Sequence, residues 1–290
     1  MKKLPGKIKL SIVILNYNTE GLLRQCLSSL PKRPDYQTIV VDNASTDNSV
    51  AMVQKEFPWV TLVKNRENYG FTKGNNAAKK VAKGEDVLFL NSDTEVYPGT
   101  LERMVRFMDE TPQAGISTCM VELPNKGMYY ASHRGFPTPW NSLLYFLGLP
   151  SDYRGNLKLL STIHEIDACS GTFLLIRKKL LDKIGWFDED YFSYGEDIEM
   201  CYRVKELGYK VYFVPDVKIL HYWGASSGLK STSKDVVKVD RENQARWNQA
   251  RYEAMRIFYD KHYRKKYPEL FRMAVLGGIG LFNFLRQGKD

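Results

Sequence analysis

Cysteine is scarce in this sequence, and its pattern does not favour a cysteine-based site. The four cysteines lie far apart, at Cys26, Cys119, Cys169 and Cys201, and none belongs to a Cys-x-x-Cys pair. Because structural zinc sites usually rest on such pairs, zinc is not expected here. Cysteines scattered through apolar segments are typical of reduced, buried thiols in a cytosolic enzyme.

Long apolar runs are also missing. A membrane-spanning helix needs roughly 18–20 mostly apolar residues, and no stretch of the chain reaches that length. The amino terminus, residues 1–7, is basic, but the apolar stretch after it, Leu10–Leu15, is too short for a signal-peptide core and precedes no cleavage site. We therefore expect a cytoplasmic protein.

The sequence also lacks the glycine patterns of two large nucleotide-binding classes. Its glycine-containing loop, residues 68–76, reads NYGFTKGNN and matches neither the GxGxxG nor the P-loop spacing. Neither Rossmann-type dinucleotide binding nor nucleoside triphosphate hydrolysis is therefore indicated. Because the loop opens a predicted helix, its backbone N–H groups and Lys73 are candidates for contacting phosphate, with Gly70 and Asn75 beside them. A purely structural loop is the alternative.

The residues that are present indicate a globular protein with one basic end. Aromatic residues make up 13% and charged residues 26% of the 290 residues, and a chain of this length can bury a sizeable core. The net charge of +9 is uneven, because residues 241–290 hold 11 Lys/Arg and 5 Asp/Glu, which is +6. Such a tail indicates an anionic partner or a solvated helix.

The first 90 residues alternate between strand-like and helix-like segments. Strands are predicted at 9–15, 38–41, 60–64 and 86–90, and helices at 19–30, 46–57 and 73–82. This order predicts an α/β fold with a Rossmann-like, mostly parallel sheet that has helices on both faces.

The second half is less regular. Residues 120–161 are rich in Pro, Gly, Tyr and Trp and predict an irregular insertion, either a lid or a covering loop. A pair of strands is predicted within Ile166–Ile176, around Gly171. Helices at 177–184 and 198–207 and strands at 209–214 and 217–221 complete the predicted elements.

Polar side chains follow several predicted strands. They are Asn16, Tyr17, Asn18, Asp42, Asn43, Asn91, Ser92 and Asp93. In an open α/β sheet the carboxyl ends of the strands border the crevice that binds ligands. Asp42 is placed to accept a hydrogen bond from a nucleobase or a sugar hydroxyl. Asp93 is placed to hold a divalent cation that shares its shell with phosphate and water, although a turn or helix cap is the alternative for this segment.

Two further groups carry chemistry in the second half. Glu196 and Asp197 precede a predicted helix, where carboxylates either favour the helix dipole or accept a proton from a sugar hydroxyl. His221 ends the last predicted strand. A lone histidine is commonly structural, but a neutral imidazole here is also a candidate ligand for a metal otherwise held by oxygens.

Taken in order, these segments resemble glycosyltransferase family 2. The segments are SIVILNYN (11–18), VVDNASTD (40–47), NYGFTKGNN (68–76), FLNSD (89–93), SGTFLLIR (170–177), IGWFDE (184–189), YFSYGED (191–197) and the stretch from Pro215 to His221. The second half is similar to the rhamnosyltransferase-like branch. The resemblance covers roughly residues 9–228 and implies the GT-A fold.

The resemblance also implies roles for single residues. It implies inverting transfer from a nucleotide sugar assisted by Mg²⁺ or Mn²⁺, with Asp42 reading the nucleobase and Asp197 acting as the base. Asp93 becomes the metal ligand of a DxD-type motif, and His221 the second protein ligand. Asn91 departs from that motif, because an amide keeps the acceptor oxygen but lacks the charge, so metal binding depends more on Asp93 and the diphosphate.

The implied function is sugar transfer, with dTDP-rhamnose as the suggested donor, onto a lipid-linked or polysaccharide acceptor in cell-envelope glycan synthesis. The expected place is the inner face of the cell membrane, with peripheral attachment and possible homodimer formation. Two alternatives are a nucleotidyltransferase and a non-catalytic subunit that binds sugar nucleotide or membrane. The former needs a glycine-rich basic loop after the first strand, and residues 16–20 are not one.

The chain divides on this interpretation into a GT-A domain, 1–228, and a carboxyl-terminal helical extension, 229–290. Residues 241–272 alternate aromatic with basic side chains, and 273–285 form an uncharged stretch of 13 residues that suits the headgroup boundary of a bilayer. Packing of this helix on the body or on another subunit is the alternative. No nucleic-acid motif accompanies the basic residues, so nucleic acid is not an expected partner.

Overall fold

The computed structural model describes residues 7–125, 127–146, 149, 151, 160–222, 249–250 and 253–287. Its strands are β1 (Leu10–Asn16), β2 (Tyr36–Asp42), β3 (Thr61–Lys64), β4 (Asp86–Asn91), β5 (Thr94–Val96), β6 (Ala114–Glu122), β7 (His164–Ile166), β8 (Phe173–Arg177) and β9 (Lys210–His221). Its α-helices are α1 (Glu20–Ser29), α2 (Ser49–Glu56), α3 (Gly70–Asn76), α4 (Thr100–Glu110), α5 (Pro139–Phe146), α6 (Lys178–Ile184), α7 (Glu196–Glu206) and α9 (Glu269–Gln287). Short 3₁₀ turns lie at Ala77–Lys80 and Tyr130–Ser132, and a π-helical turn at Tyr259–Tyr263.

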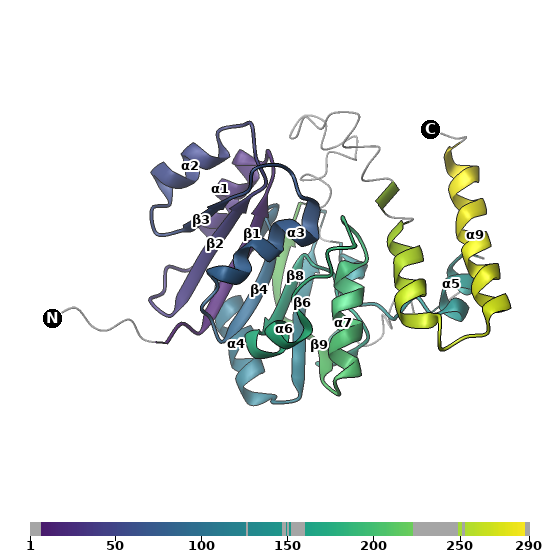
Figure 1. Cartoon of the computed structure of the whole chain (residues 1–290). Coiled ribbons are helices and arrows are strands. Elements are labelled where there is room, and N and C mark those ends of the chain that lie inside the picture. Colours follow the sequence, from purple (N-terminus) through teal and green to yellow (C-terminus); the bar gives the residue numbers. More distant parts are fainter. Residues whose placement is uncertain are drawn as a thin grey trace.

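One mixed sheet of nine strands organises the described residues, in the order β3-β2-β1-β4-β8-β6-β9-β5, with β7 also paired to β9. The four strands predicted in the first 90 residues are all present and run parallel to one another. Strand β8 lies antiparallel between β4 and β6. Figure 1 shows β1 to β3 on one side of the molecule, and β6, β8 and β9 between them and helix α7. The predicted α/β fold is confirmed, with a sheet that is parallel in its first half and mixed in its second.

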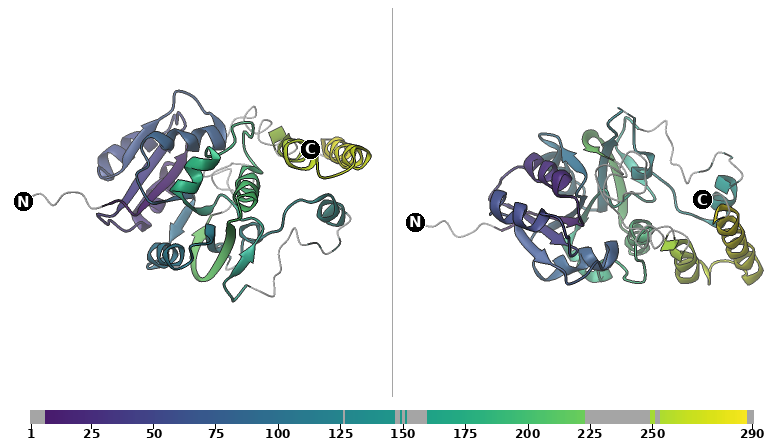
Figure 2. Two further views of the ribbon diagram at one scale, coloured as in Figure 1. Left: turned by 60° about the horizontal axis from the view of Figure 1, so that its bottom comes forward. Right: turned by 90° about the horizontal axis from the view of Figure 1, so that it is seen from above.

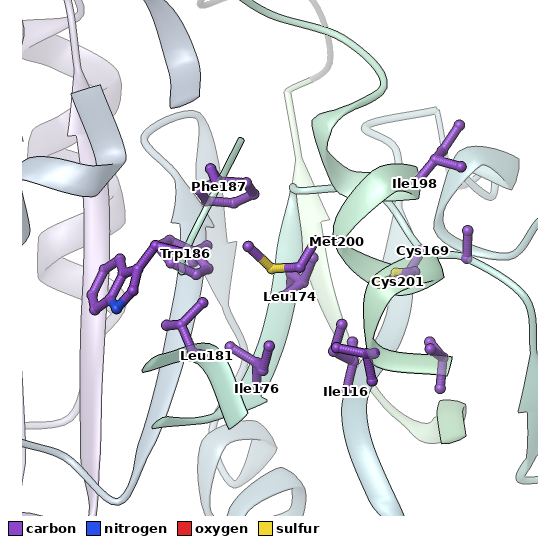
Figure 3. Close-up of a cluster of buried hydrophobic side chains, with 14 of the residues drawn as sticks. Ile116, Cys169, Leu174, Ile176, Leu181, Trp186, Phe187, Ile198, Met200 and Cys201 are labelled. Atoms are coloured by element: carbon purple, nitrogen blue, oxygen red, sulfur yellow. Dashed lines mark hydrogen bonds between the residues drawn. The ribbon is translucent and has the colours of Figure 1, made fainter. Parts of the chain in front are cut away.

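Helices cover both faces of the sheet because successive strand residues point to opposite sides. In β1, Val13 faces one buried cluster, while Ile12 and Ile14 face the other. The second cluster is closed by α1, α2 and α4, and the first by α6 and α7. Figure 3 shows the first cluster, where Met200 of α7 lies beside Leu174 of β8.

Two strands, β7 and β8, lie on either side of Gly171 as predicted, but they do not pair with each other: β7 pairs with β9, and β8 with β4 and β6. One prediction about strands is wrong. The strands predicted at 209–214 and 217–221 are one strand, β9. A proline cannot donate to a strand ladder, but the register between β6 and β9 shifts near Pro215, so the strand passes it as an irregularity.

Other elements were not predicted, or occupy a segment that was predicted to be irregular. Strand β5, helix α4 and most of β6 occupy residues 94–122, where no element was predicted. The segment expected to be irregular includes α5 and a 3₁₀ turn. The expected domain boundary between residues 228 and 229 lies outside the described residues.

The described part of the carboxyl-terminal extension packs on α7. Phe258, Tyr259 and Tyr263 are buried, and the ring of Phe258 lies edge-on to Tyr202 of α7 with centroids 5.5 Å apart. Lys261 forms ion pairs with Asp188 and Asp190. Aromatic and basic residues of the extension are therefore used, in part, to hold it on the body.

Candidate active site

The carboxyl ends of three adjacent strands create the site. Asn16 of β1 is in register with Asp42 of β2, and Leu15 of β1 with Asn91 of β4. Parallel strands bring their carboxyl ends to one edge of the sheet, as the sequence predicted. A cavity of about 220 Å³ opens there. Its lining includes Tyr17, Asn43, Gly70, Asn91, Ser92, Asp93, Tyr129, Glu196, Asp197 and His221.

Asp42 is buried beneath this cavity in a polar network and is absent from the lining. Its Oδ1 accepts hydrogen bonds from the Asn16 amide at 3.0 Å and the Ser45 hydroxyl at 2.6 Å, and its Oδ2 accepts the Ser45 N–H at 2.9 Å. The Asn16 amide also donates to the Ser45 hydroxyl at 3.0 Å. Asp42 therefore fixes the turn after β2.

Asn18 and Asn75 have local structural partners. Asn18 has a left-handed backbone (φ 54°), and its Oδ1 accepts the N–H of Thr46 at 2.7 Å. Asn75 donates from Nδ2 to the Phe71 carbonyl at 2.9 Å. Neither side chain lines the cavity. Both therefore act on the shape of the loops that surround it.

Lys73 also lies outside the cavity lining. Its ammonium group is 4.5 Å from the centroid of the Tyr69 ring, and the residue is exposed. The geometry places it on the outer side of the loop.

The side chain of Asn43 joins the loop after β2 to the loop between β3 and α3, at the edge of the cavity. Its Nδ2 donates to Asn68 Oδ1 and to the carbonyl of Gly70, both at 3.0 Å, and its Oδ1 accepts from the Asn65 amide at 2.8 Å. Gly70 has φ 77°, and an added Cβ would lie 2.6 Å from the ring and carbonyl of Phe192. Only glycine fits there without displacement of its neighbours.

Asp93 and His221, far apart in the sequence, meet because β5 pairs with β9. His221 Nε2 lies 3.2 Å from Asp93 Oδ1, and the residues are 3% and 1% exposed. The ring of Tyr129 packs edge-on against His221 with centroids 5.3 Å apart. Within the part of the chain that the structure describes, no group of three or more His, Cys, Asp or Glu residues is arranged to hold a metal. The protein therefore offers two adjacent donors and not a complete cage.

Asp197 opens α7 and is held by three donors. Its Oδ2 accepts from Arg134 Nη2 at 2.7 Å and from the Gly171 N–H at 3.1 Å, and its Oδ1 accepts the Ile198 N–H at 2.8 Å. Arg134 reaches it because the backbones of Arg134 and Ala168 exchange two hydrogen bonds, at 3.1 and 2.9 Å.

Arg134 was not predicted as a site residue. It lies in the segment 120–161, where neither periodicity nor a motif marked any position. A single arginine in an irregular segment carries no sequence signal of its partner.

Glu196 is a second buried carboxyl group at this end of the cavity. Burial, and then the charge of Asp197, raise the pKa of Glu196 to about 8, while the guanidinium of Arg134 acts in the opposite direction. Its Oε2 has no hydrogen-bond partner among the described residues. Glu196 therefore holds its proton more tightly than an ordinary glutamic acid does, and it lies beside a carboxylate that is paired with arginine.

Comparison with known proteins identifies the family. The family model for glycosyl transferase family 2 matches residues 11–185, more than half of the chain. The chain belongs to glycosyltransferase family 2.

Its sequence relatives include rhamnosyltransferases. This glycosyltransferase is 24% identical over 219 residues to rhamnosyltransferase WbbL of Escherichia coli (strain K12), covering 73% of this chain and 82% of the relative. It is 26% identical over 246 residues to the N-acetylglucosaminyl-diphospho-decaprenol L-rhamnosyltransferase of Mycobacterium tuberculosis, covering 77% and 79%.

Solved structures share its fold. The mannosyltransferase PcManGT of Pyrobaculum calidifontis, in complex with GDP-Man and Mn²⁺, superposes with a TM-score of 0.60 at 19% identity, covering 95% of this chain and 70% of that one. TarS 1–349 of S. aureus, in complex with UDP-GlcNAc, gives 0.57 at 22% identity, covering 93% and 71%. The fold of this glycosyltransferase is therefore GT-A.

Proposed function

We propose that this glycosyltransferase moves a sugar, with rhamnose from dTDP-rhamnose as the first candidate, from a nucleotide sugar to a lipid-linked acceptor, with inversion at the anomeric carbon. The observation that carries the proposal is the cavity in which Asp93, His221 and Asp197 converge from three parts of the chain. The rhamnosyltransferase relatives support the donor and the acceptor.

The donor end of the site is the edge formed by β1, β2 and β4. Asn43, Gly70, Asn91 and Ser92 line it, and the nucleotide lies against this edge in the proposal. Asp42 acts from beneath, by holding the turn after β2 in place. The proposed role of the loop 68–76 is to close one side of the nucleotide pocket through the bonds of Asn43.

A divalent cation, Mg²⁺ or Mn²⁺, fits the pair Asp93 and His221. A carboxylate oxygen and an imidazole nitrogen 3.2 Å apart supply two donors suited to Mn²⁺. When bound, the ion would neutralise the charge that develops on the leaving diphosphate. The amide of Asn91 leaves the protein one charge short of a DxD pair. This leads us to expect that the ion binds more tightly with the nucleotide than alone.

Asp197 is the proposed base. A sugar hydroxyl is a weak nucleophile at pH 7, and a carboxylate that takes its proton accelerates attack by about 10²–10⁴-fold. The proton of the acceptor hydroxyl passes to Asp197 as the oxygen bonds to the anomeric carbon and the nucleoside diphosphate leaves. Since this displacement uses one carboxylate and no covalent sugar–enzyme intermediate, it inverts the configuration. Arg134, which now pairs with Asp197, orients the carboxylate.

Asp197→Asn tests the role of this residue. We expect calorimetry to detect unchanged donor binding, while turnover falls by about 10²–10⁴-fold because the amide cannot accept the proton. Asp190→Asn is the matched control, since the Asp190 side chain is 67% exposed and pairs with Lys261 outside the cavity. Unchanged turnover in Asp197→Asn would exclude Asp197 as the base.

A donor screen tests the substrate class. Calorimetric titrations with dTDP-, UDP- and GDP-sugars, each with and without Mn²⁺, should select one nucleotide sugar and show tighter binding with the ion. Absence of binding to all of them would contradict the proposal. Normal donor binding with no transfer to any acceptor would instead favour a non-catalytic, sugar-nucleotide-binding subunit.

A lipid-linked acceptor requires access to a membrane. Among the residues that the structure describes, no helix combines the length and the apolar character needed to cross a bilayer. In the proposal the enzyme therefore binds peripherally, on the inner face of the cell membrane where nucleotide sugars are available.

A further inference from the structure

Exposed apolar side chains gather on two helices that are distant in the sequence. On α5, Trp140 is 63% and Leu143 45% exposed. On the first turns of α9, Leu270 is 83%, Phe271 41% and Met273 60% exposed. Single exposed apolar residues are normal on a protein surface, but a group of them marks an interaction site. We name this group, Trp140, Leu143, Leu270, Phe271 and Met273, the α5–α9 surface.

A contact joins α5 to the π-helical turn that precedes α9. Ser142 of α5 is buried, and its hydroxyl lies 3.3 Å from the hydroxyl of Tyr259 in the π-helical turn before α9. In Figure 1, α5 and α9 both lie on the side of the molecule opposite β3. The α5–α9 surface is therefore one region of the molecule.

Each helix turns its apolar residues outward as a stripe. Trp140 and Leu143 are three residues apart and so share one face of α5, while Ser142 points inward. On α9, Leu270 and Met273 share a face in the same way. Val275 and Leu276, one turn further along α9, are partly buried and pack against the core. The first turns of α9 therefore expose apolar side chains, whereas the following turn contacts the core.

Cations border the surface. Arg264 and Lys265 are exposed in the turn that leads into α9, and neither forms an ion pair with a described residue. Lys266, in contrast, pairs with Glu206 of α7. The nearby acidic residue Glu269 sits in the first turn of α9, where it favours the helix dipole. The border of the surface is therefore suited to an anionic partner.

We propose that the α5–α9 surface binds the face of an anionic lipid bilayer. The inference rests on the proposed function in one respect: a lipid-linked acceptor is the reason why this enzyme would need to bind a membrane. Apolar side chains and a tryptophan bordered by arginine and lysine match the boundary between acyl chains and anionic headgroups.

Vesicle binding tests the proposal with matched pairs of variants. The full-length protein is sedimented with vesicles of phosphatidylcholine that contain or lack phosphatidylglycerol. Leu143→Glu should bind the vesicles that contain phosphatidylglycerol with a partition coefficient at least 10-fold lower than that of wild type. Leu207→Glu should behave as wild type, because Leu207 is an exposed leucine (40%) at the end of α7, outside the surface.

A second pair tests the cations. Lys265→Gln should lower partitioning by about 5-fold, since a basic residue near an anionic membrane contributes about 1 kcal/mol. Lys80→Gln, which changes an exposed lysine in the 3₁₀ turn beside α3, should have no effect. The loss should disappear with phosphatidylcholine alone and at high salt.

Two controls separate this inference from the proposed function. Donor binding by Leu143→Glu should equal that of wild type, which also shows that the variant is folded. Equal partitioning of Leu143→Glu and wild type would overturn the inference while leaving the catalytic proposal intact. Light scattering that detects a dimer broken by Leu143→Glu, without vesicle binding by wild type, would also overturn it and assign the surface to a second copy.

Discussion

At the scale of single residues, two neighbouring carboxyl groups are used differently. Asp197 accepts hydrogen bonds from three donors, including the guanidinium of Arg134. Glu196 is buried, and one of its oxygens has no partner among the described residues. The sequence marks both only as acidic residues at a helix start. The pairing of Asp197 depends on Arg134, which comes from a different segment of the chain, and so it was not predictable from spacing.

The raised pKa of Glu196 predicts a pH-dependent stability. The folded protein holds a proton on Glu196 up to about pH 8, whereas the unfolded chain releases it near 4.5. Its contribution to stability is therefore fully present below pH 4.5 and is lost as pH rises toward 8. Glu196→Gln, which stays neutral, should gain melting temperature relative to wild type between pH 4.5 and 8.

Thermal unfolding of both proteins at pH 5 and pH 8.5 measures this difference, at about 2–4 °C for each kcal/mol. Asp86, whose pKa burial raises to about 6, is present in both proteins and cancels from the comparison. A difference in melting temperature that is the same at both pH values would contradict the assignment.

The lack of space for a side chain at Gly70 gives a prediction about stability and donor binding. Gly70→Ala should destabilise the fold and weaken donor binding, because its Cβ would collide with Phe192 at 2.6 Å. Gly99→Ala is the control: Gly99 also has a positive φ (83°), but nothing lies within 4 Å of its added Cβ. It should cost only the roughly 1–2 kcal/mol of left-handed backbone. Urea unfolding and donor titration compare the two; equal losses would show that the contact with Phe192 is unimportant.

At the scale of elements, the sequence predicted the parts that alternate regularly between strand and helix. Strands β1 to β4 follow alternating segments of clear apolar character, and the regular strand–helix alternation indicated parallel pairing even for β1 and β4, which are distant in the chain. β7, β8 and β9 pair with strands far away in the sequence, so their partners could not be read from their own residues. Pro215 indicated a break, yet the register shift beside it lets β9 continue to His221.

The same limit applies to the candidate site. Asn43, Asn91, Asp93, Asp197 and His221 were chosen by position after strands or before a helix, and they line the cavity. Asn16, Asn18 and Asp42 were chosen in the same way, but they hold the turns beside it. Lys73 and Asn75 were chosen by type within a loop, and they lie outside it. The direction of a side chain in a turn depends on backbone angles that residue type does not fix.

The docking of the extension on α7 predicts that two of its phenylalanines contribute differently to the free energy of unfolding. Phe258→Ala should cost about 3–5 kcal/mol, because Phe258 is 3% exposed against Tyr202. Phe271→Ala, at 41% exposure on α9, should cost less than about 1 kcal/mol. Denaturant unfolding of each variant measures the two values. If Phe258→Ala left stability unchanged, the extension would not contribute to the folded body.

At the scale of the whole molecule, every cysteine is buried. Cys26, Cys119, Cys169 and Cys201 are free thiols, and burial is the main cause that raises the pKa of Cys26 to about 12. Since thiolate is the reactive form, we expect no thiol to react rapidly with a disulfide reagent in the native protein and all four to react in denaturant. A colorimetric titration counts them, and a fast-reacting thiol in the native state would contradict the burial.

The late position of strand β9 in the sequence determines when the site can form during synthesis of the polypeptide. It is the common neighbour of β5, β6 and β7, and it ends at His221, well after the residue at which the family match stops. Domains emerge from the ribosome amino terminus first, so β5 and β6 leave it long before the strand that unites them. An interrupted translation product lacking β9 would hold Asp93 without His221, so the proposed metal site can form only after residue 221 has left the ribosome.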